Sequence, residues 1–248
     1  MHPEYAIIIP VQNEAACLGD VLAEIKTCFA DNDDSRFAIA VGLNACTDNS
    51  RQIAENSGVL VGETADSGYG HGCLAAIHAA NAALSDLKGY IFVAGDGANV
   101  PDDIIRLADA FESNNGGEKK IIMGLRKFEL ATWSSEFGRA LPNLLLGIAC
   151  AALGGQFFHD LGPLRLIERR LFEKIDPQEL TWGWTIEAQI MAARFGEAIS
   201  PITVTERPRL SGEQKVSGVS LTRSAKIGWK IFLAAVRTRF RKPDSIES

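Results

Sequence analysis

The chain has 248 residues, of which 46% are hydrophobic and 23% are charged. This balance supplies a core for one large domain or two small ones and excludes a wholly disordered chain. The formal net charge of −6 excludes a general nucleic-acid-binding protein, although residues 214–242 carry eight Lys or Arg and no acidic residue.

The cysteines and the apolar segments indicate a cellular location. No two of the five cysteines form a C-x-x-C pair, which predicts a reducing compartment and no zinc site. Residues 1–10 lack a basic start followed by a long apolar stretch, so we expect no signal peptide. Pro142 and Asn143 interrupt the apolar segment 140–158, which favours a buried helix over a membrane span. We therefore expect a cytoplasmic protein, with membrane association at the cytoplasmic face as an open alternative.

Strands and helices are predicted to alternate along the first half of the chain. In chain order we expect strand 5–10, helix 12–29, strand 37–44, a turn and helix over 46–58, strand 59–63, helix 68–87, strand 90–94, helix 100–113 and strand 120–126. This alternation is typical of an α/β fold, with a parallel sheet covered by helices on both faces. The second half is less regular, with helices predicted near 138–153, 169–175, 183–196 and 221–240 and a strand at 198–206.

Polar and glycine-rich clusters follow the predicted strands. They are Gln12-Asn13-Glu14, Asn44, Gly68-Tyr69-Gly70, Asp96 and Arg126. Ligands of parallel α/β sheets bind at the carboxyl ends of the strands. Because scattered surface polarity would not track strand ends in this way, the pattern predicts a ligand site at one edge of the sheet.

Eight segments occur in the order that they have in one enzyme family. They are IIIPVQNEA, NACTDNS, GYGHG, GDGANVPDD, GLR, HDLGPLR, GWTIEAQ and RPRLSGEQKVSG, spread over residues 7–218. This ordered set resembles the family 2 glycosyltransferases with the GT-A nucleotide-sugar-binding fold, and it is most similar to the branch that includes dolichyl-phosphate mannose synthase. The resemblance implies one Rossmann-like domain at 1–240, with a nucleotide-sugar-binding half (1–127), an acceptor-side half (128–220), a basic amphipathic helix (221–240) and a frayed tail (241–248).

The resemblance implies a set of nucleotide-sugar-binding residues. The family pattern P-x-x-N-E supports the nucleotide, and Pro10, Asn13 and Glu14 match it, with Gln12 between them. Asn44 stands at a base-contacting position, while Gly68, Tyr69 and Gly70 would line the nucleotide pocket. Two structural alternatives stay open, namely a helix cap at Asn13 and a tight strand-to-helix turn at the glycines.

The family usually has D-x-D-G after the fourth strand, where two carboxylates serve a divalent metal bound to the donor diphosphate. This chain has Ala94-Gly95-Asp96-Gly97, so one carboxylate remains. Because Mg²⁺ commonly takes only one or two protein ligands, the resemblance still implies Mg²⁺ or Mn²⁺ at Asp96. Arg126 would help to hold Asp96 or the donor. The alternative is that Asp96 organises its own loop by accepting backbone N–H groups.

The acceptor side supplies charge and a candidate base. Arg207, Arg209 and Lys215 match a basic loop of the family and would stabilise the leaving diphosphate. Glu187 falls where many relatives carry an acidic residue that serves as base, and Asp160 is the rival. An ionised acceptor, such as a lipid phosphate, would need no base. Arg165 follows a D-x-G-x-x-R pattern and would bind an acceptor phosphate, with packing as the alternative.

Together these features predict an inverting glycosyltransferase that moves a sugar from a nucleoside-diphosphate sugar to an acceptor such as a lipid phosphate or a small molecule. Two alternatives stay open. One is a nucleotidyltransferase, although its glycine-rich basic loop is missing after the first strand, and the other is a non-catalytic nucleotide-sugar-binding protein, which Ala94 favours. The basic amphipathic helix at 221–240 either contacts an anionic membrane or packs on its own domain.

Overall fold

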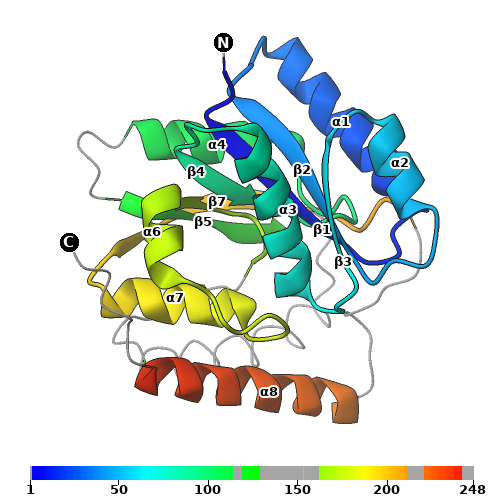
Figure 1. The fold of residues 1–248 in the computed structure, drawn as a ribbon. Coiled ribbons are helices and arrows are strands. Elements are labelled where there is room, and N and C mark those ends of the chain that lie inside the picture. Colours follow the sequence, from blue (N-terminus) through cyan, green and yellow to red (C-terminus); the bar gives the residue numbers. More distant parts are fainter. Residues whose placement is uncertain (1, 114–118, 129–152, 154–161, 212–220, 242–248) are drawn as a thin grey trace.

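The computed structural model describes residues 2–113, 119–128, 153, 162–211 and 221–241 (Figure 1). The strands are β1 (Tyr5–Val11), β2 (Phe37–Asn44), β3 (Leu60–Thr64), β4 (Gly89–Phe92), β5 (Lys119–Phe128), β6 (Arg165–Glu168) and β7 (Ala198–Glu206). The helices are α1 (Leu18–Asp31), α2 (Ser50–Asn56), α3 (Tyr69–Ala83), α4 (Pro101–Glu112), α6 (Arg169–Ile175), α7 (Trp184–Arg194) and α8 (Leu221–Phe240). Apart from residue 153, the helix predicted at 138–153 lies outside the described residues.

The described strands form one sheet in the order β3-β2-β1-β4-β6-β5-β7. The β1 strand pairs in parallel with β2 and β4, and β5 pairs in parallel with β7. The β6 strand runs antiparallel to both of its neighbours, β4 and β5. The predicted α/β fold with a mostly parallel sheet is therefore confirmed, whereas the sequence pattern does not indicate β6. The sheet continues across the predicted boundary between the two halves of the domain.

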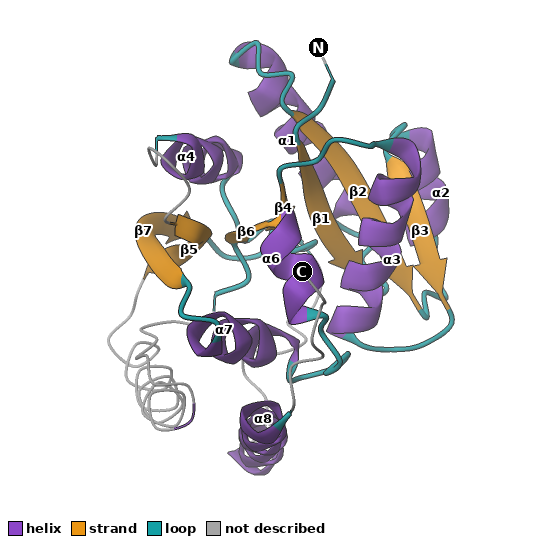
Figure 2. Ribbon diagram, turned by 60° about the vertical axis from the view of Figure 1, so that its left-hand side comes forward, coloured by secondary structure: helices purple, strands orange, loops and turns teal. Residues whose placement is uncertain are grey.

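Helices cover both faces of the sheet because the central strands are apolar on both sides (Figure 2). In β1, Tyr5, Ile7 and Ile9 face the core shared with α1 and α4, whereas Ala6 and Ile8 face the core shared with α3, α6 and α7. All five side chains are fully buried. A strand that is buried on both faces reads as a continuous apolar run, as this one does.

The helix α3 lies unusually close to the sheet, and glycines make that approach possible. A Cβ placed on Gly42 of β2 would lie 1.8 Å from the carbonyl oxygen of Gly72 in α3. A Cβ on Gly62 of β3 would lie 1.9 Å from the carbonyl oxygen of Ala75. The amino-terminal half of α3 is thereby held against β2 and β3.

The last helix forms a further layer outside α7 (Figure 1). Ala234 and Ala235 of α8 pack against Ile186 and Ile190 of α7 in a small core of their own. Among the described residues, no helix has the length and apolar character needed to cross a membrane.

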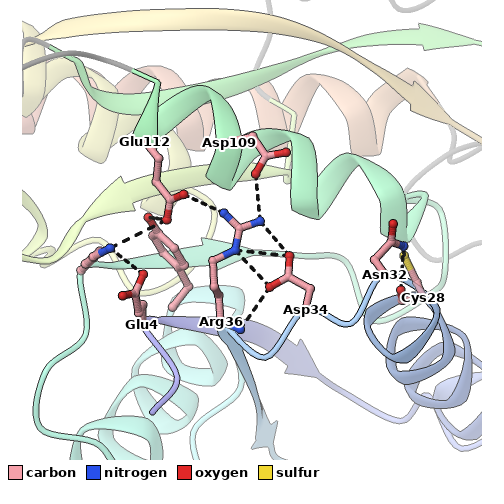
Figure 3. Close-up of polar contacts among 9 residues, drawn as sticks. Glu4, Cys28, Asn32, Asp34, Arg36, Asp109 and Glu112 are labelled. Carbon is pink, nitrogen blue, oxygen red and sulfur yellow. Dashed lines mark hydrogen bonds and ion pairs between the residues drawn. The ribbon is translucent and has the colours of Figure 1, made fainter. Parts of the chain in front are cut away.

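An ion-pair network ties the amino ends of the strands together, at the edge away from the predicted site (Figure 3). Arg36, just before β2, bonds to Asp34 and also to Asp109 and Glu112 of α4 at 2.7 to 2.8 Å. The Tyr5 hydroxyl donates to Glu112 at 2.9 Å. These contacts fix α4 to the beginning of β1 and β2, so the network has a structural role.

Candidate functional site

The loops after β1 and β2 are joined by side-chain contacts. The Asn13 backbone has a positive φ of 56°, and its Oδ1 accepts a hydrogen bond from the Thr47 backbone N–H at 2.7 Å. The Cys46 thiol donates to the Val11 carbonyl at 3.2 Å. Because α1 begins at Leu18 after an N-cap at Cys17, Asn13 is no helix cap. Asn13 instead connects two strand ends.

Asn44 occupies a narrow buried position between β2 and α3. Its side-chain N–H donates to the Gly68 carbonyl at 2.7 Å, while its amide oxygen has no hydrogen-bond partner. A Cβ on Gly72 would lie 2.7 Å from the Asn44 amide nitrogen and 2.9 Å from Pro10 Cβ. Gln12 donates to the Ser67 hydroxyl at 2.6 Å on the exposed side of the same edge. Four of the predicted nucleotide-binding residues thus lie close together, namely Pro10, Gln12, Asn44 and Gly68.

The amino end of α3 is closed by a neighbouring loop. The backbone N–H groups of Gly70 and His71 both donate to the Leu180 carbonyl, at 3.0 and 3.2 Å. Gly68 has φ of 152°, so the turn itself requires glycine. These N–H groups therefore fasten the loop 176–183 to α3, and the Tyr69 hydroxyl is buried beside them.

The Asp96 loop is ordered by its own side chains. Asp96 Oδ1 accepts from the Ala98 N–H at 3.1 Å, and Asn99 Oδ1 accepts from the Ala94 N–H at 2.9 Å. Within the described residues, the buried Asn99 amide nitrogen has no hydrogen-bond partner. The Asn99 amide oxygen, the atom that could bind a cation, is already used by the Ala94 N–H. Among the described residues, no three His, Cys, Asp or Glu side chains come together as metal ligands. Within the described residues, Asp96 is thus the carboxylate that would hold a divalent cation, with phosphate and water completing the coordination.

The basic loop after β7 folds back onto the Asp96 loop. The Arg207 backbone N–H donates to the Ala98 carbonyl at 3.0 Å, and its guanidinium donates to the Gly97 carbonyl at 2.8 Å and pairs with Glu24 of α1. The Leu210 N–H donates to the Asp96 carbonyl at 3.0 Å. The loop is thereby held over the ends of β1 and β4.

Arg209 brings a buried positive charge to this edge. It forms a 2.5 Å ion pair with Glu14, with side-chain exposures of 9% and 13%. Burial opposes its charged form, but Glu14 and Asp96 outweigh burial and raise the pKa of Arg209 above its ordinary value. Arg209, Glu14 and Asp96 thus lie together, whereas Lys215 falls outside the described residues.

Arg165 is a buried cation without a hydrogen-bond partner. Arg165 is the first residue of β6 and is 1% exposed. Its guanidinium carbon lies over the Phe92 ring, 5.0 Å from the ring centroid. Within the part of the chain that the structure describes, none of its three guanidinium nitrogens has a hydrogen-bond partner. Burial raises the pKa of Tyr69 and of Cys73, and the nearby Arg165 charge partly offsets that rise in both. A buried charge of this kind is costly unless an anion pairs with it.

Glu187 is fully engaged by neighbouring donors. Its Oε2 accepts from the backbone N–H groups of Gln178 and Glu179 at 2.9 and 2.7 Å, and its Oε1 accepts from Arg241 at 2.8 Å. Burial raises the pKa of Glu187, although these donors oppose the rise. The contacts favour a positioning role for the loop 176–183, and the assignment of Glu187 as base stays a prediction.

Arg126 takes part in an ion pair between β5 and β7. Arg126 of β5 pairs with Glu206 of β7 at 3.3 Å, and Glu206 lies opposite Asn99 in an isolated β-bridge. Arg126 is thus linked to the Asp96 loop through Glu206, and its predicted contact with Asp96 or the donor stays a prediction. The rival base Asp160 lies outside the described residues.

The seven-stranded, mostly parallel sheet and its flanking helices match the GT-A fold of solved glycosyltransferase structures. No protein-family model matches the chain. It is 25% identical over 215 residues to uncharacterized glycosyltransferases of Mycobacterium tuberculosis (strain H37Rv) and Mycobacterium bovis, covering 86% of this chain and 89% of each relative.

Solved structures with the same fold include glucosyl-3-phosphoglycerate synthase from Mycobacterium tuberculosis. Its complex with phosphoglyceric acid has a TM-score of 0.68 at 17% identity, and covers 98% of this chain and 82% of that one. Its complex with Mn²⁺, UDP-glucose and glycerol 3-phosphate has a TM-score of 0.66 at 16% identity with the same coverage. At these identities the likeness establishes the fold alone. Placement in the dolichyl-phosphate mannose synthase branch stays a prediction.

Proposed function

We propose that this protein is a glycosyltransferase that moves a sugar from a nucleoside-diphosphate sugar to an acceptor. The observation that carries the proposal is the convergence of loops from distant parts of the chain at one sheet edge. Asn13 bonds to Thr47, and the Asp96 loop bonds to the loop that carries Arg209. The curated relatives that are named glycosyltransferases support the same activity.

The donor is proposed to be a uridine diphosphate sugar, because the solved structures include complexes with UDP and UDP-glucose. In this chain the unpaired amide oxygen of Asn44 would accept an N–H from the base. Arg209 and Arg207 would face the diphosphate from the loop after β7. The glycosidic bond to the leaving diphosphate breaks as the acceptor oxygen bonds to the anomeric carbon, and these guanidinium groups would stabilise the charge that develops on the diphosphate.

A divalent cation, Mn²⁺ or Mg²⁺ as in the solved relatives, is proposed as cofactor. When bound, it would neutralise charge on the leaving diphosphate. Asp96 is the residue of this chain that would hold it. The Asp96 carboxylate also accepts a bond from its own loop, so the protein contributes less to the coordination than two carboxylates would.

The acceptor is proposed to carry a phosphate or carboxylate group. Arg165 has three buried nitrogens without partners, and an anionic acceptor would satisfy them. The solved relative binds phosphoglyceric acid and glycerol 3-phosphate, which supports an acidic acceptor. Inversion at the anomeric carbon stays a prediction, and the anomeric proton coupling of the product decides it.

The test is turnover of UDP-sugars in the presence of Mn²⁺, with and without phosphorylated acceptors. We expect sugar release or transfer by the wild type and a loss of at least about tenfold for Asp96→Ala. Asp102→Ala, at an exposed position in the first turn of α4, is the matched control and should keep full activity. Equal turnover in wild type and Asp96→Ala would remove Asp96 from the site, whereas no turnover in either protein would contradict the proposed activity.

The second candidate is a non-catalytic nucleotide-sugar-binding protein, which Ala94 favours. It predicts binding of UDP-sugars by saturation-transfer NMR without turnover in any variant. Transfer to a phosphorylated acceptor that weakens selectively in Arg165→Met, with unchanged release of sugar to water, would instead support the anionic acceptor site.

A further inference from the structure

We propose that α8 binds the surface of an anionic membrane through the side that faces away from the protein. The helix has a clear inner side, where Ala234, Ala235 and Thr238 are 1%, 0% and 2% exposed. This inner side rests on α7, so that α8 lies outside α7 among the described elements (Figure 2). The proposal does not depend on the proposed transferase activity.

The outer side of α8 is apolar. Trp229, Phe232, Leu233 and Phe240 are exposed by 61%, 37%, 38% and 78%. Their spacing places them together on one side of a helix, and the rings of Trp229 and Phe232 stack with centroids 5.5 Å apart. Single exposed apolar residues are normal, whereas a continuous stripe marks an interaction surface.

This stripe holds most of the large exposed hydrophobic side chains of the described residues. The two others are Trp182 and Leu210, which lie on loops. Trp182 belongs to the loop 176–183, against which α8 is fastened by the Arg237–Glu179 ion pair. The apolar exposure of the protein is therefore concentrated on one helix and the loop next to it.

The charge pattern selects the partner. From Leu221 to Phe240 the helix contains no acidic residue, and Lys230, Arg237 and Arg239 are exposed beside the apolar stripe. An apolar stripe flanked by basic residues matches anionic lipid headgroups over acyl chains. A second copy of the same surface would bring like charges together, which disfavours self-association through α8.

The shape of the surface agrees with a membrane. In both views the helix α8 lies outside α7 (Figures 1 and 2), and a helix at such a position can lie along a flat lipid surface. Exposed Trp is typical of the membrane–water interface. Since no described helix can cross a membrane, α8 would lie on the surface.

Membrane contact would also orient the candidate site. Ala234 packs so closely on Gly183 that a Cβ there would lie 2.5 Å from the Ala234 side chain. The same loop 176–183 receives the N–H groups at the amino end of α3 through Leu180. A membrane-bound α8 would therefore hold the loop 176–183, and with it the amino end of α3, at a constant distance from the lipid surface.

The experiment is co-sedimentation of the full chain with vesicles of phosphatidylcholine alone or with roughly one third phosphatidylglycerol. We expect binding to the anionic vesicles, weak binding to the neutral ones, and weakening in roughly 0.5 M salt. Lys230→Gln and Arg239→Gln should each weaken binding about fivefold, and Trp229→Ser should weaken it further. Lys26→Gln and Arg51→Gln, at exposed positions on α1 and α2, are the charge-matched controls.

Circular dichroism should give the same helix content for every variant, because the altered side chains are exposed. Equal binding to neutral and anionic vesicles, or equal weakening by the α1, α2 and α8 variants, would overturn the proposal. So would a dimer in sedimentation equilibrium that Trp229→Ser dissociates, since a second copy would then cover the stripe. Capture of α8 by an acidic peptide with no vesicle binding would equally overturn it.

Discussion

At Glu187 both carboxylate oxygens are already used by donors, and the group is 1% exposed. Glu187→Gln keeps the shape but removes the charge that faces Arg241. We expect a lower melting temperature, because removing one partner of a buried pair costs about 3 kcal/mol, and a fall in kcat of less than about tenfold. Thermal unfolding and steady-state kinetics measure the two effects.

The control is Glu173→Gln, at an exposed position on α6, which should change neither quantity. General bases contribute about 10²- to 10⁴-fold to the rate. A fall in kcat of about a thousandfold with unchanged unfolding would therefore make Glu187 the base and remove its positioning role.

Replacement of glycine by alanine should have opposite effects on the free energy of unfolding at Gly42 and at Gly19. Gly42→Ala forces a Cβ to within 1.8 Å of the Gly72 carbonyl in the backbone of α3, so we expect destabilisation of about 3 kcal/mol or more. Gly19 lies in α1, and its Cβ would meet only Ile53 at 3.6 Å. Gly19→Ala should therefore stabilise by up to about 1 kcal/mol. Urea unfolding of both variants provides the comparison, and similar midpoints for the two would contradict the close approach of α3 to β2.

Among the elements, regular periodicity could be predicted and short or non-local structure could not. The strand predicted at 198–206 and the helix predicted at 169–175 have the same bounds in the structure. The strand β6 has four residues, too few for an alternating pattern to appear. The predicted helix at 12–29 begins only at Leu18, because the preceding residues bond to the loop after β2.

The candidate site was predictable as a set of strand ends but not as a set of contacts. Parallel topology alone brings Asn13, Asn44 and Asp96 to one edge. The pairing of Glu14 with Arg209 joins residues 195 positions apart, and Glu24, which holds Arg207, has no pattern around it that marks such a contact. The unpaired state of Arg165 depends on burial, which a sequence pattern does not give.

The Arg36 network predicts how the joined elements respond to acid. Hydrogen bonds from Arg36 lower the pKa of Asp34 below its ordinary value of 3.8, although burial opposes the shift. A carboxyl group whose pKa is lowered by folding stabilises the folded state at pH values above its unfolded pKa. This stabilisation is lost as the pH falls through the folded pKa. We therefore expect Asp34→Asn to be less stable than wild type at pH 7 and to lose less stability between about pH 4 and pH 2.

Urea unfolding across that pH range measures the difference between the two proteins. Asp31→Asn, at an exposed position on α1, controls for the change in net charge. Parallel stability curves for wild type and Asp34→Asn over the acid range would show that the Arg36 pair contributes nothing measurable.

Across the whole molecule, the loop after β7 connects one edge of the sheet to the end of the inner strand β1. The β7 strand lies at the edge opposite β3, yet Ser211 donates to the Ala16 carbonyl before α1 at 2.6 Å, and Arg209 pairs with Glu14. The segment that follows β7 therefore crosses from that edge of the sheet to the residues that follow the inner strand β1. A nucleotide that binds there would contact both halves of the domain, and it should therefore stabilise the protein as a unit.

Arg209→Gln tests whether this closure carries part of the diphosphate charge. At UDP about 100-fold above its Kd, Mn²⁺ and UDP should stabilise the wild type by about 2.7 kcal/mol and raise Tm by about 5 to 10 °C. Because Arg209 stays charged beside Asp96, chelation of Mn²⁺ should reduce the shift in wild type without abolishing it. In Arg209→Gln the shift, measured against the variant's own unliganded Tm, should be smaller with Mn²⁺ and absent without it. Arg106→Gln, on the exposed side of α4, should behave as wild type, and a shift in Arg209→Gln equal to wild type in both conditions would remove Arg209 from diphosphate binding.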